Sequence, residues 1–184
     1  DGFGTGVLTA VCAQDEFTAP ANYATNNTDC NDSDVNYYQT YPFYVDADGD
    51  GYGTGNLVSV CAMFDFLPPN NYSLNNTDCD DTNALKYTTF TFYVDADGDG
   101  YGSTTTDLAC AVDANTAPSG YSISDTDCDD ADATKHTTFA FYIDGDGDGY
   151  GSGTPEMICA ANASAAPAGY SADNTDCDDA DNLK

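Results

Sequence analysis

The residues best suited to chemistry in this chain are aspartates spaced two apart in a glycine-rich loop. Asp46, Asp48 and Asp50 occupy positions 1, 3 and 5 of such a loop, and Gly51 follows at position 6. Carboxylates at this spacing on a tightly turning backbone can converge on one hard cation, and glycine permits the sharp turn. The pattern recurs twice, at Asp95, Asp97 and Asp99 and at Asp144, Asp146 and Asp148.

This loop matches the first half of an EF-hand calcium loop, in which the carbonyl oxygen at position 7 is a further ligand. Position 7 is Tyr52, Tyr101 or Tyr150 in the three copies. The bidentate Glu expected at position 12 is replaced by Leu57, Thr106 or Pro155, and no helical pattern flanks the loop. The loop is therefore not an EF-hand, and its remaining oxygen ligands must come from elsewhere in the chain.

A second acidic segment, Thr-Asp-Cys-Asp-Asp, is the obvious donor of those ligands. We expect the two segments together to bind one or two Ca²⁺ ions, although helix capping or simple solvation is an alternative role for the second segment. The carboxylates concerned are Asp78, Asp80 and Asp81; Asp127, Asp129 and Asp130; Asp176, Asp178 and Asp179; and, in an incomplete first copy, Asp1, Asp29 and Asp32.

An internal repeat of 49 residues places these segments in order along the chain. Complete repeats span 38–86, 87–135 and 136–184, and an incomplete repeat, 1–37, precedes them. Because repeat 1–37 opens inside its own acidic loop, we interpret the chain as a window on a longer array, with proteolytic processing as a competing explanation. The period predicts four modules of one architecture.

The elements expected in each module are short strands joined by loops. Aromatic and β-branched runs at 43–45, 92–94 and 141–143 favour strands, and a second apolar run such as 57–61 follows each acidic loop. A proline-containing connection then ends in Asn or Gly before Tyr, which predicts a turn with positive φ. The predicted fold is a small β-rich, loop-dominated tandem repeat, a linear array of disulfide- and calcium-stapled modules.

The eight cysteines predict disulfides rather than a zinc site, because they are 18 and 31 residues apart and the chain has one His. Pairing within each module is our prediction, and bridges between neighbouring modules are the alternative. The predicted pairs are Cys12–Cys30, Cys61–Cys79, Cys110–Cys128 and Cys159–Cys177.

The charge and composition exclude several classes of protein. The net charge is −29, with 30 Asp, two Glu, three Lys and no Arg, so nothing is available to neutralise nucleic-acid phosphates. No run approaches the roughly 20 apolar residues of a membrane span. The abundant aromatic residues argue against a disordered acidic tail. No nucleophile–base set is present, and His136 has Tyr38 and Tyr87 at its matching positions, so we interpret it as an ordinary strand residue and expect no enzyme.

The combination of (F/Y)YxDxDGDGYG with a downstream DCDD resembles the metal-binding repeats of secreted and cell-surface bacterial proteins. It is also similar in logic to thrombospondin type 3 calcium repeats. The resemblance covers every module and implies a calcium-binding extracellular or cell-surface protein, of bacterial origin, that forms a stalk, fibril or filament. We expect self-assembly or continuation of a longer array to supply its partners. The threonine pairs at 88–89 and 137–138 suggest O-glycans, whereas the Asn-x-Ser/Thr matches do not recur in all four repeats. The alternative is a secreted module array that sequesters metal or binds a ligand or glycan.

Overall fold

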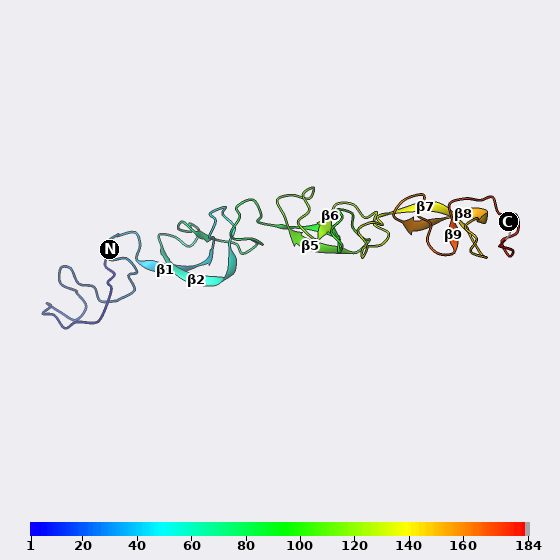
Figure 1. Ribbon diagram of the computed structural model, residues 1–184. Coiled ribbons are helices and arrows are strands. Elements are labelled where there is room, and N and C mark those ends of the chain that lie inside the picture. The colour runs from blue at the N-terminus through cyan, green and yellow to red at the C-terminus, as the bar shows by residue number, and fades with distance from the viewer. Residues whose placement is uncertain (183–184) are drawn as a thin grey trace. The chain divides into compact units, whose positions relative to one another are not determined.

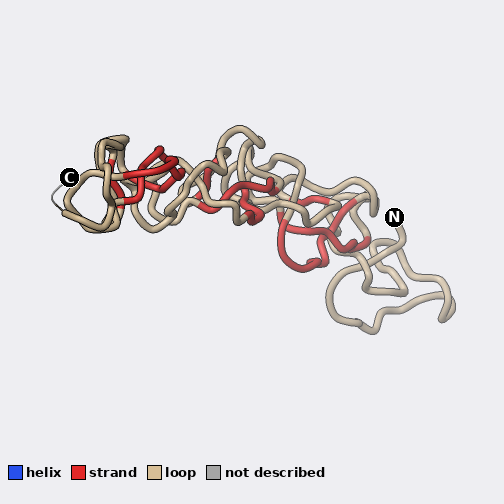
Figure 2. The backbone as a smooth tube through the Cα atoms, turned by 90° about the vertical axis from the view of Figure 1, so that its right-hand side faces the viewer, coloured by secondary structure: helices blue, strands red, loops and turns tan. Residues whose placement is uncertain are grey.

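The computed structural model describes residues 1–182, and these residues form β-strands and loops without any helix (Figure 2). The last two residues of the predicted module 136–184 lie outside the described part of the chain. The contacts divide the chain into two compact units, Asp1–Thr88 and Thr89–Lys184. The prediction of a β-rich, loop-dominated fold is confirmed.

The first unit contains one antiparallel sheet of three strands in the order β2-β1-β3, of which Figure 1 labels β1 and β2. Strand β1 (Gln39–Val45) is central, β2 (Thr54–Ala62) pairs along its length, and β3 (Tyr72–Ser73) pairs only with its end. The acidic loop connects β1 to β2, so the hairpin holds both ends of that loop. Residues 1–37 form loops and turns.

The second unit contains two sheets with the same strand arrangement, β5-β4-β6 and β8-β7-β9. The aromatic and β-branched runs form the central strand of each sheet, as expected, and the second apolar runs form one edge. The two-residue third strands were not expected. The bounds are β4 (Thr89–Val94), β5 (Thr106–Cys110), β6 (Tyr121–Ser122), β7 (Thr137–Ile143), β8 (Ser152–Ala160) and β9 (Tyr170–Ser171).

The turn predicted before the tyrosine that recurs in each repeat is confirmed, and this turn explains the short third strands. Asn71 has a φ of 66°, and its carbonyl accepts a hydrogen bond from the Asp46 amide at 2.9 Å. The left-handed residue reverses the chain, so that Tyr72 enters the sheet opposite Val45. The matching turn residues also have positive φ, and they are Asn22, Gly120 and Gly169.

The hydrophobic core of each sheet is small and centres on one phenylalanine. Phe43, Phe92 and Phe141 are at most 2 % exposed, and around Phe92 the buried neighbours are Ala109 and Ala111. Many other large apolar side chains stay exposed, Leu57 and Leu108 among them. A core of this size supplies little stability, so the fold depends on other restraints.

Disulfides are one of those restraints, but the predicted pairing within modules is wrong. Cys30 bonds Cys61, and Cys128 bonds Cys159, each across 31 residues, which is the alternative pairing between neighbouring repeats. Cys79 and Cys110 are disulfide-bonded as well. Cys12 and Cys177, which were predicted to pair with Cys30 and Cys159, are free in this chain.

The sheet geometry explains why Cys61 cannot pair with Cys79. The Asp78 amide donates to the Gly53 carbonyl, which places Cys79 beside the start of β2. Cys61 lies opposite Thr40, seven residues further along β2. At the rise of an extended strand, these seven residues separate Cys61 from the start of β2 by about 20 Å. A disulfide needs Cα atoms about 4.4–6.8 Å apart. Cys30 arrives at the right end because the chain enters β1 there, and its Cα lies 5.6 Å from that of Cys61.

Replacing the central phenylalanine tests the small core. We expect Phe92→Ala to lower the free energy of unfolding by about 3–5 kcal/mol, because the ring is buried against Ala109 and Ala111. Leu108→Ala is the matched control, since Leu108 is 62 % exposed in the paired strand and its loss should cost no more than about 0.5 kcal/mol. Urea denaturation measures both. Equal losses for the two variants would contradict the assigned core.

Removing one bridge tests the observed pairing. The double variant Cys30→Ala/Cys61→Ala should lower the free energy of unfolding by about 3–4 kcal/mol, because a loop of 31 residues is no longer closed in the unfolded chain. Cys12→Ala removes a free thiol and should leave stability unchanged. Peptide mapping without reduction supplies the direct check, and a Cys12–Cys30 peptide would contradict the structure.

Candidate metal centre

The first aspartate of each loop uses its carboxylate to hold the loop backbone in shape. Asp46 is 3 % exposed, and its two carboxylate oxygens accept hydrogen bonds from the amides of Gly49 (2.7 Å) and Gly51 (3.0 Å). Gly51 has a φ of 93°, as the sequence pattern required. Asp46 therefore closes the backbone into a tight ring and fixes the position of the carboxylates that follow.

Asp48 and Asp50 each use one oxygen for the loop and leave the other free. Oδ1 of Asp48 accepts from the Asp50 amide at 3.2 Å, and Oδ1 of Asp50 accepts from the Tyr52 amide at 2.8 Å. The Oδ2 atoms of both residues are buried without a hydrogen-bond partner. Buried carboxylate oxygens are normally satisfied, so these two atoms indicate a missing electrostatic partner.

The second acidic segment is brought to the loop by backbone hydrogen bonds. The Gly53 amide donates to the Asn75 carbonyl at 3.2 Å, and the Asp78 amide donates to the Gly53 carbonyl at 3.1 Å. Oδ1 of Asp81 accepts from the Ala47 amide at 2.7 Å. These contacts act within one repeat and bring the two acidic segments together without a Cys61–Cys79 bridge.

The two segments form a cluster that could hold a metal ion. Asp46, Asp48 and Asp50 offer oxygens within 4.8 Å of one another, and so do Asp48, Asp78 and Asp81. Asp78 is 7 % exposed, and its Oδ2 has no hydrogen-bond partner. Asp48 belongs to both groups, so the five carboxylates are continuous around it.

The same arrangement recurs in the second unit. Further groups have oxygens within 4.8 Å of one another: Asp95, Asp97 and Asp99; Asp97, Asp127 and Asp130; and Asp144, Asp146 and Asp148. Buried Oδ2 atoms without a hydrogen-bond partner belong to Asp97, Asp99, Asp127, Asp146 and Asp176. The loop amides of Ala96 and Gly145 donate to Asp130 and Asp179 as Ala47 does to Asp81.

The electrostatics of the middle loop carboxylate agree with this geometry. Burial raises the pKa of Asp48 above its ordinary value, and repulsion from Asp50, Asp78 and Asp46 raises it further. Burial likewise raises the pKa of Asp97 and of Asp146, again with neighbouring carboxylates contributing. Concentrated negative charge is unfavourable unless a cation or proton compensates it.

Two predicted ligands make ion pairs with lysine instead of joining the clusters. Oδ2 of Asp80 lies 3.5 Å from Lys86 Nζ, and Oδ2 of Asp129 lies 3.2 Å from Lys135 Nζ. The Thr82 hydroxyl, followed by Lys86, lowers the pKa of Asp80. Lys135 also holds Asp132, whose pKa falls to about 2 through that hydrogen bond.

Asp178 and the tyrosines at loop position 7 contribute backbone amides to the hydrogen bonds of the site. The Asp178 amide donates to Asp176 Oδ1 at 2.8 Å. Tyr52 contributes its amide to the loop, and Tyr101 and Tyr150 do the same. The carbonyl oxygens of these three tyrosines stay predicted ligands.

The incomplete first repeat keeps part of the arrangement. Oδ1 of Asp1 accepts from the Phe3 amide at 3.0 Å, as Asp50 does from Tyr52. Asp29 is 8 % exposed, and its amide donates to the Gly4 carbonyl at 3.0 Å. Asp32 stays a predicted ligand.

A buried serine that sequence reasoning missed ties the loop to the third strand. The Ser73 hydroxyl donates to the Gly51 carbonyl at 2.7 Å and accepts from the Asn75 amide at 3.2 Å. Ser122 and Ser171 make the same contacts with Gly100 and Gly149. These serines recur at the period of 49, so the repeat alignment contained the signal.

Comparison with protein families, with curated proteins and with solved structures gives no match for this chain. The interpretation of the site therefore depends on its own geometry. Within residues 1–182, no helix has the length and apolar character that crossing a membrane requires. The six disulfide-bonded cysteines fit an oxidising, extracellular environment.

The buried serine provides a test of how the loop is positioned. Ser73→Ala should lower the free energy of unfolding by about 1–3 kcal/mol, because the Gly51 carbonyl and the Asn75 amide both lose a buried partner. Ser59→Ala, at an exposed position in β2, should change it by less than about 0.5 kcal/mol. Thermal unfolding at fixed calcium measures both variants, and an unchanged Ser73→Ala protein would refute the positioning role.

Proposed function

We propose that this chain is a calcium-binding extracellular structural repeat protein, in which Ca²⁺ and disulfides rigidify successive repeats into a stalk or filament. The observation that carries the proposal is that Asp48 shares one carboxylate cluster with Asp50 and another with Asp78, and that the Oδ2 atoms of all three residues are buried without a hydrogen-bond partner. Both clusters recur at the loop that begins at Asp95, and the first cluster recurs at the loop that begins at Asp144.

The donor set favours calcium over other metals. Every clustered ligand is a carboxylate, which is the donor that hard cations prefer. Two oxygens on opposite sides of a Ca²⁺ ion are about 4.8 Å apart, since each bond is about 2.4 Å long, and the clustered oxygens all fall within that span. Mg²⁺ prefers to keep several waters, and the cysteines that zinc would use are mostly disulfide-bonded.

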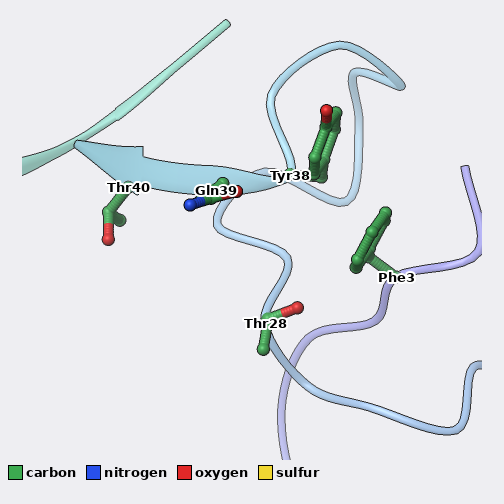
Figure 3. A pocket seen from close by; sticks show the side chains of 5 residues that line it. All are labelled: Phe3, Thr28, Tyr38, Gln39 and Thr40. Atoms are coloured by element: carbon green, nitrogen blue, oxygen red, sulfur yellow. The ribbon is translucent and has the colours of Figure 1, made fainter. Parts of the chain in front are cut away.

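A structural role is supported by the way each repeat is connected to its neighbour. The Cys30–Cys61 and Cys128–Cys159 bridges each join the second acidic segment of one repeat to a strand of the following repeat. Aromatic stacks also join loop position 7 of one repeat to the first residue of the following repeat. Phe3 and Tyr38 stack at 4.7 Å (Figure 3), and Tyr52 and Tyr87 stack at 4.5 Å.

The proposed mechanism of rigidification is electrostatic. Without a cation, the clustered carboxylates repel one another, and the small cores around Phe43, Phe92 and Phe141 oppose that repulsion weakly. A bound ion links the acidic loop to the second acidic segment. Each site stabilises the folded state by about 2.7 kcal/mol when free calcium is 100 times the dissociation constant. Extracellular modules bind calcium with constants of about 10⁻⁴ to 10⁻³ M, so 1 mM free calcium stabilises the folded state by about 0.4–1.4 kcal/mol per site.

Calcium removal tests the structural proposal. Adding EGTA should lower the melting temperature and shorten or broaden the length distribution from small-angle scattering, because the clustered charges are no longer compensated. Readdition of Ca²⁺ should restore both values. The proposal would be refuted if adding EGTA changed neither the melting temperature nor the length derived from scattering. A monomer that tightly takes up one other metal, without assembling, would favour the sequestering alternative.

One isosteric substitution separates metal binding from general charge. In millimolar calcium, Asp78→Asn should lower the melting temperature, because a ligand is lost. In EGTA it should leave the melting temperature unchanged or raise it, because repulsion around Asp48 is relieved. Asp65→Asn removes the same charge at an exposed position outside the clusters and should behave alike in both conditions. A calcium-independent effect of Asp78→Asn would contradict the assignment.

A further inference from the structure

The outer edge of strand β2 is open and carries no charge. In its sheet, β2 pairs with β1 on one side only, so its other side presents backbone N–H and C=O groups that pair with no strand among the described residues. Its nine residues, TGNLVSVCA, include no charged side chain and no proline. Residues 55–59 are all exposed, with Leu57 at 52 % and Val58 at 39 %. A neutral, partly apolar strand edge therefore faces solvent in a chain whose net charge is −29.

The equivalent strands carry residues that block pairing with another chain. Strand β8 occupies the same positions two repeats later, and it has Pro155 and Glu156 where β2 has Leu57 and Val58. Strand β5 has Asp107 at the position of Val58. Proline and charged side chains are common protection for an edge strand against such pairing. Two sheets of this protein are thus protected at a position where β2 is not.

The turn after β2 extends the same neutral surface. Phe64 and Phe66 stack at 5.0 Å, and they are 43 % and 67 % exposed. In the two later repeats, Asp113 and Asn162 stand at the position of Phe64, and each accepts a backbone hydrogen bond that closes the turn. The fold therefore requires neither phenylalanine in this turn nor apolar residues in the edge strand. Exposed apolar groups that the fold does not require indicate an interaction surface.

The occupant that fits this edge is the same strand of a second copy. A basic partner would find no charge on β2 and would be attracted to the acidic loops instead. Two copies of this chain repel each other through their net charge, so they approach most easily where neither is charged. An antiparallel β2–β2 pair with two-fold symmetry is self-complementary, because the two edges exchange N–H and C=O groups. Val58, at the centre of the nine residues, would then face Val58 of the second copy.

We propose that two copies of this chain pair edge to edge through β2, so that their three-stranded sheets join into one sheet of six strands. This inference goes beyond the proposed function, because it adds lateral association and places no calcium in the contact. One pair of strands buries less surface than a stable dimer interface requires, so the pairing between free chains is weak. It strengthens where several chains joined together present the edge at once.

The test measures self-association of the full chain by sedimentation equilibrium in millimolar calcium. Every sample carries Cys12→Ser and Cys177→Ser, so that no disulfide between the two free thiols joins copies. We expect a reversible monomer–dimer equilibrium whose dissociation constant falls as NaCl is added, because salt screens the repulsion between acidic chains. A chain that stays monomeric at millimolar protein concentration in about 0.5 M NaCl would overturn the proposal.

The matched variant is Leu57→Pro/Val58→Glu, which installs the residues that β8 carries, so the sheet should still form. Its dissociation constant should rise at least about tenfold, because like charges oppose each other across the pair and each edge loses a donor. Leu74→Glu is the control for charge, since Leu74 is 54 % exposed and follows β3 at the other edge of the sheet. It should change the constant less than about twofold. Equal dissociation constants for the parent chain and the double variant would contradict the β2 contact.

NMR on a mixture of nitrogen-15-labelled and carbon-13-labelled chains identifies the occupant of the edge. Contacts between copies should connect residues 55–61 of one copy with residues 55–61 of the other. The uncharged segment 5–12 of the second copy is the competing occupant, because Val7 and Leu8 are 91 % and 93 % exposed. Contacts from β2 to that segment would overturn the β2–β2 pair. A melting temperature that still responds to EGTA would show that the proposed function survives such a result.

Discussion

Converging carboxylates are the constraint on which the rest of this structure depends. Each acidic loop uses its first aspartate, such as Asp46, to satisfy loop amides, and Asp48, Asp50 and Asp78 keep buried oxygens that accept no hydrogen bond from any residue that the structure describes. A hydrophobic core that is centred on one phenylalanine per sheet offers little to oppose that repulsion. The sheets, the turn at Asn71 and the hydroxyl of Ser73 all serve to hold the two acidic segments against each other.

Local features of the fold could be predicted from the sequence because short-range chemistry decides them. The aromatic runs form the central strands, Gly51 adopts the left-handed conformation that the loop requires, and Asn71 reverses the chain before Tyr72. The carboxylates that define the cluster were also named in advance, since their spacing is a local property. Asp80 and Asp129 were exceptions, because their pairing with Lys86 and Lys135 depends on how the following turn folds back.

Features set by distant contacts could not be predicted in the same way. The Cys30–Cys61 bridge depends on which end of β2 faces the entering chain, and sequence spacing is compatible with either pairing. The two-residue strand at Tyr72 pairs because the turn before it delivers it to Val45, so no propensity marks it. His136 was dismissed as a strand residue because sequence shows its neighbours along the chain and not the carboxylate of Asp99, which lies 37 positions earlier.

The central claim is that a cation belongs among Asp48, Asp50 and Asp78, and an experimental density map of the calcium-bound protein tests it most directly. The account predicts a strong peak about 2.3–2.6 Å from the Oδ2 atoms of these three residues, with further oxygens completing six to eight ligands. Equivalent peaks should occur at the loops beginning at Asp95 and Asp144. Density for water alone at saturating calcium, or carboxylates that have turned outward to solvent, would contradict the account.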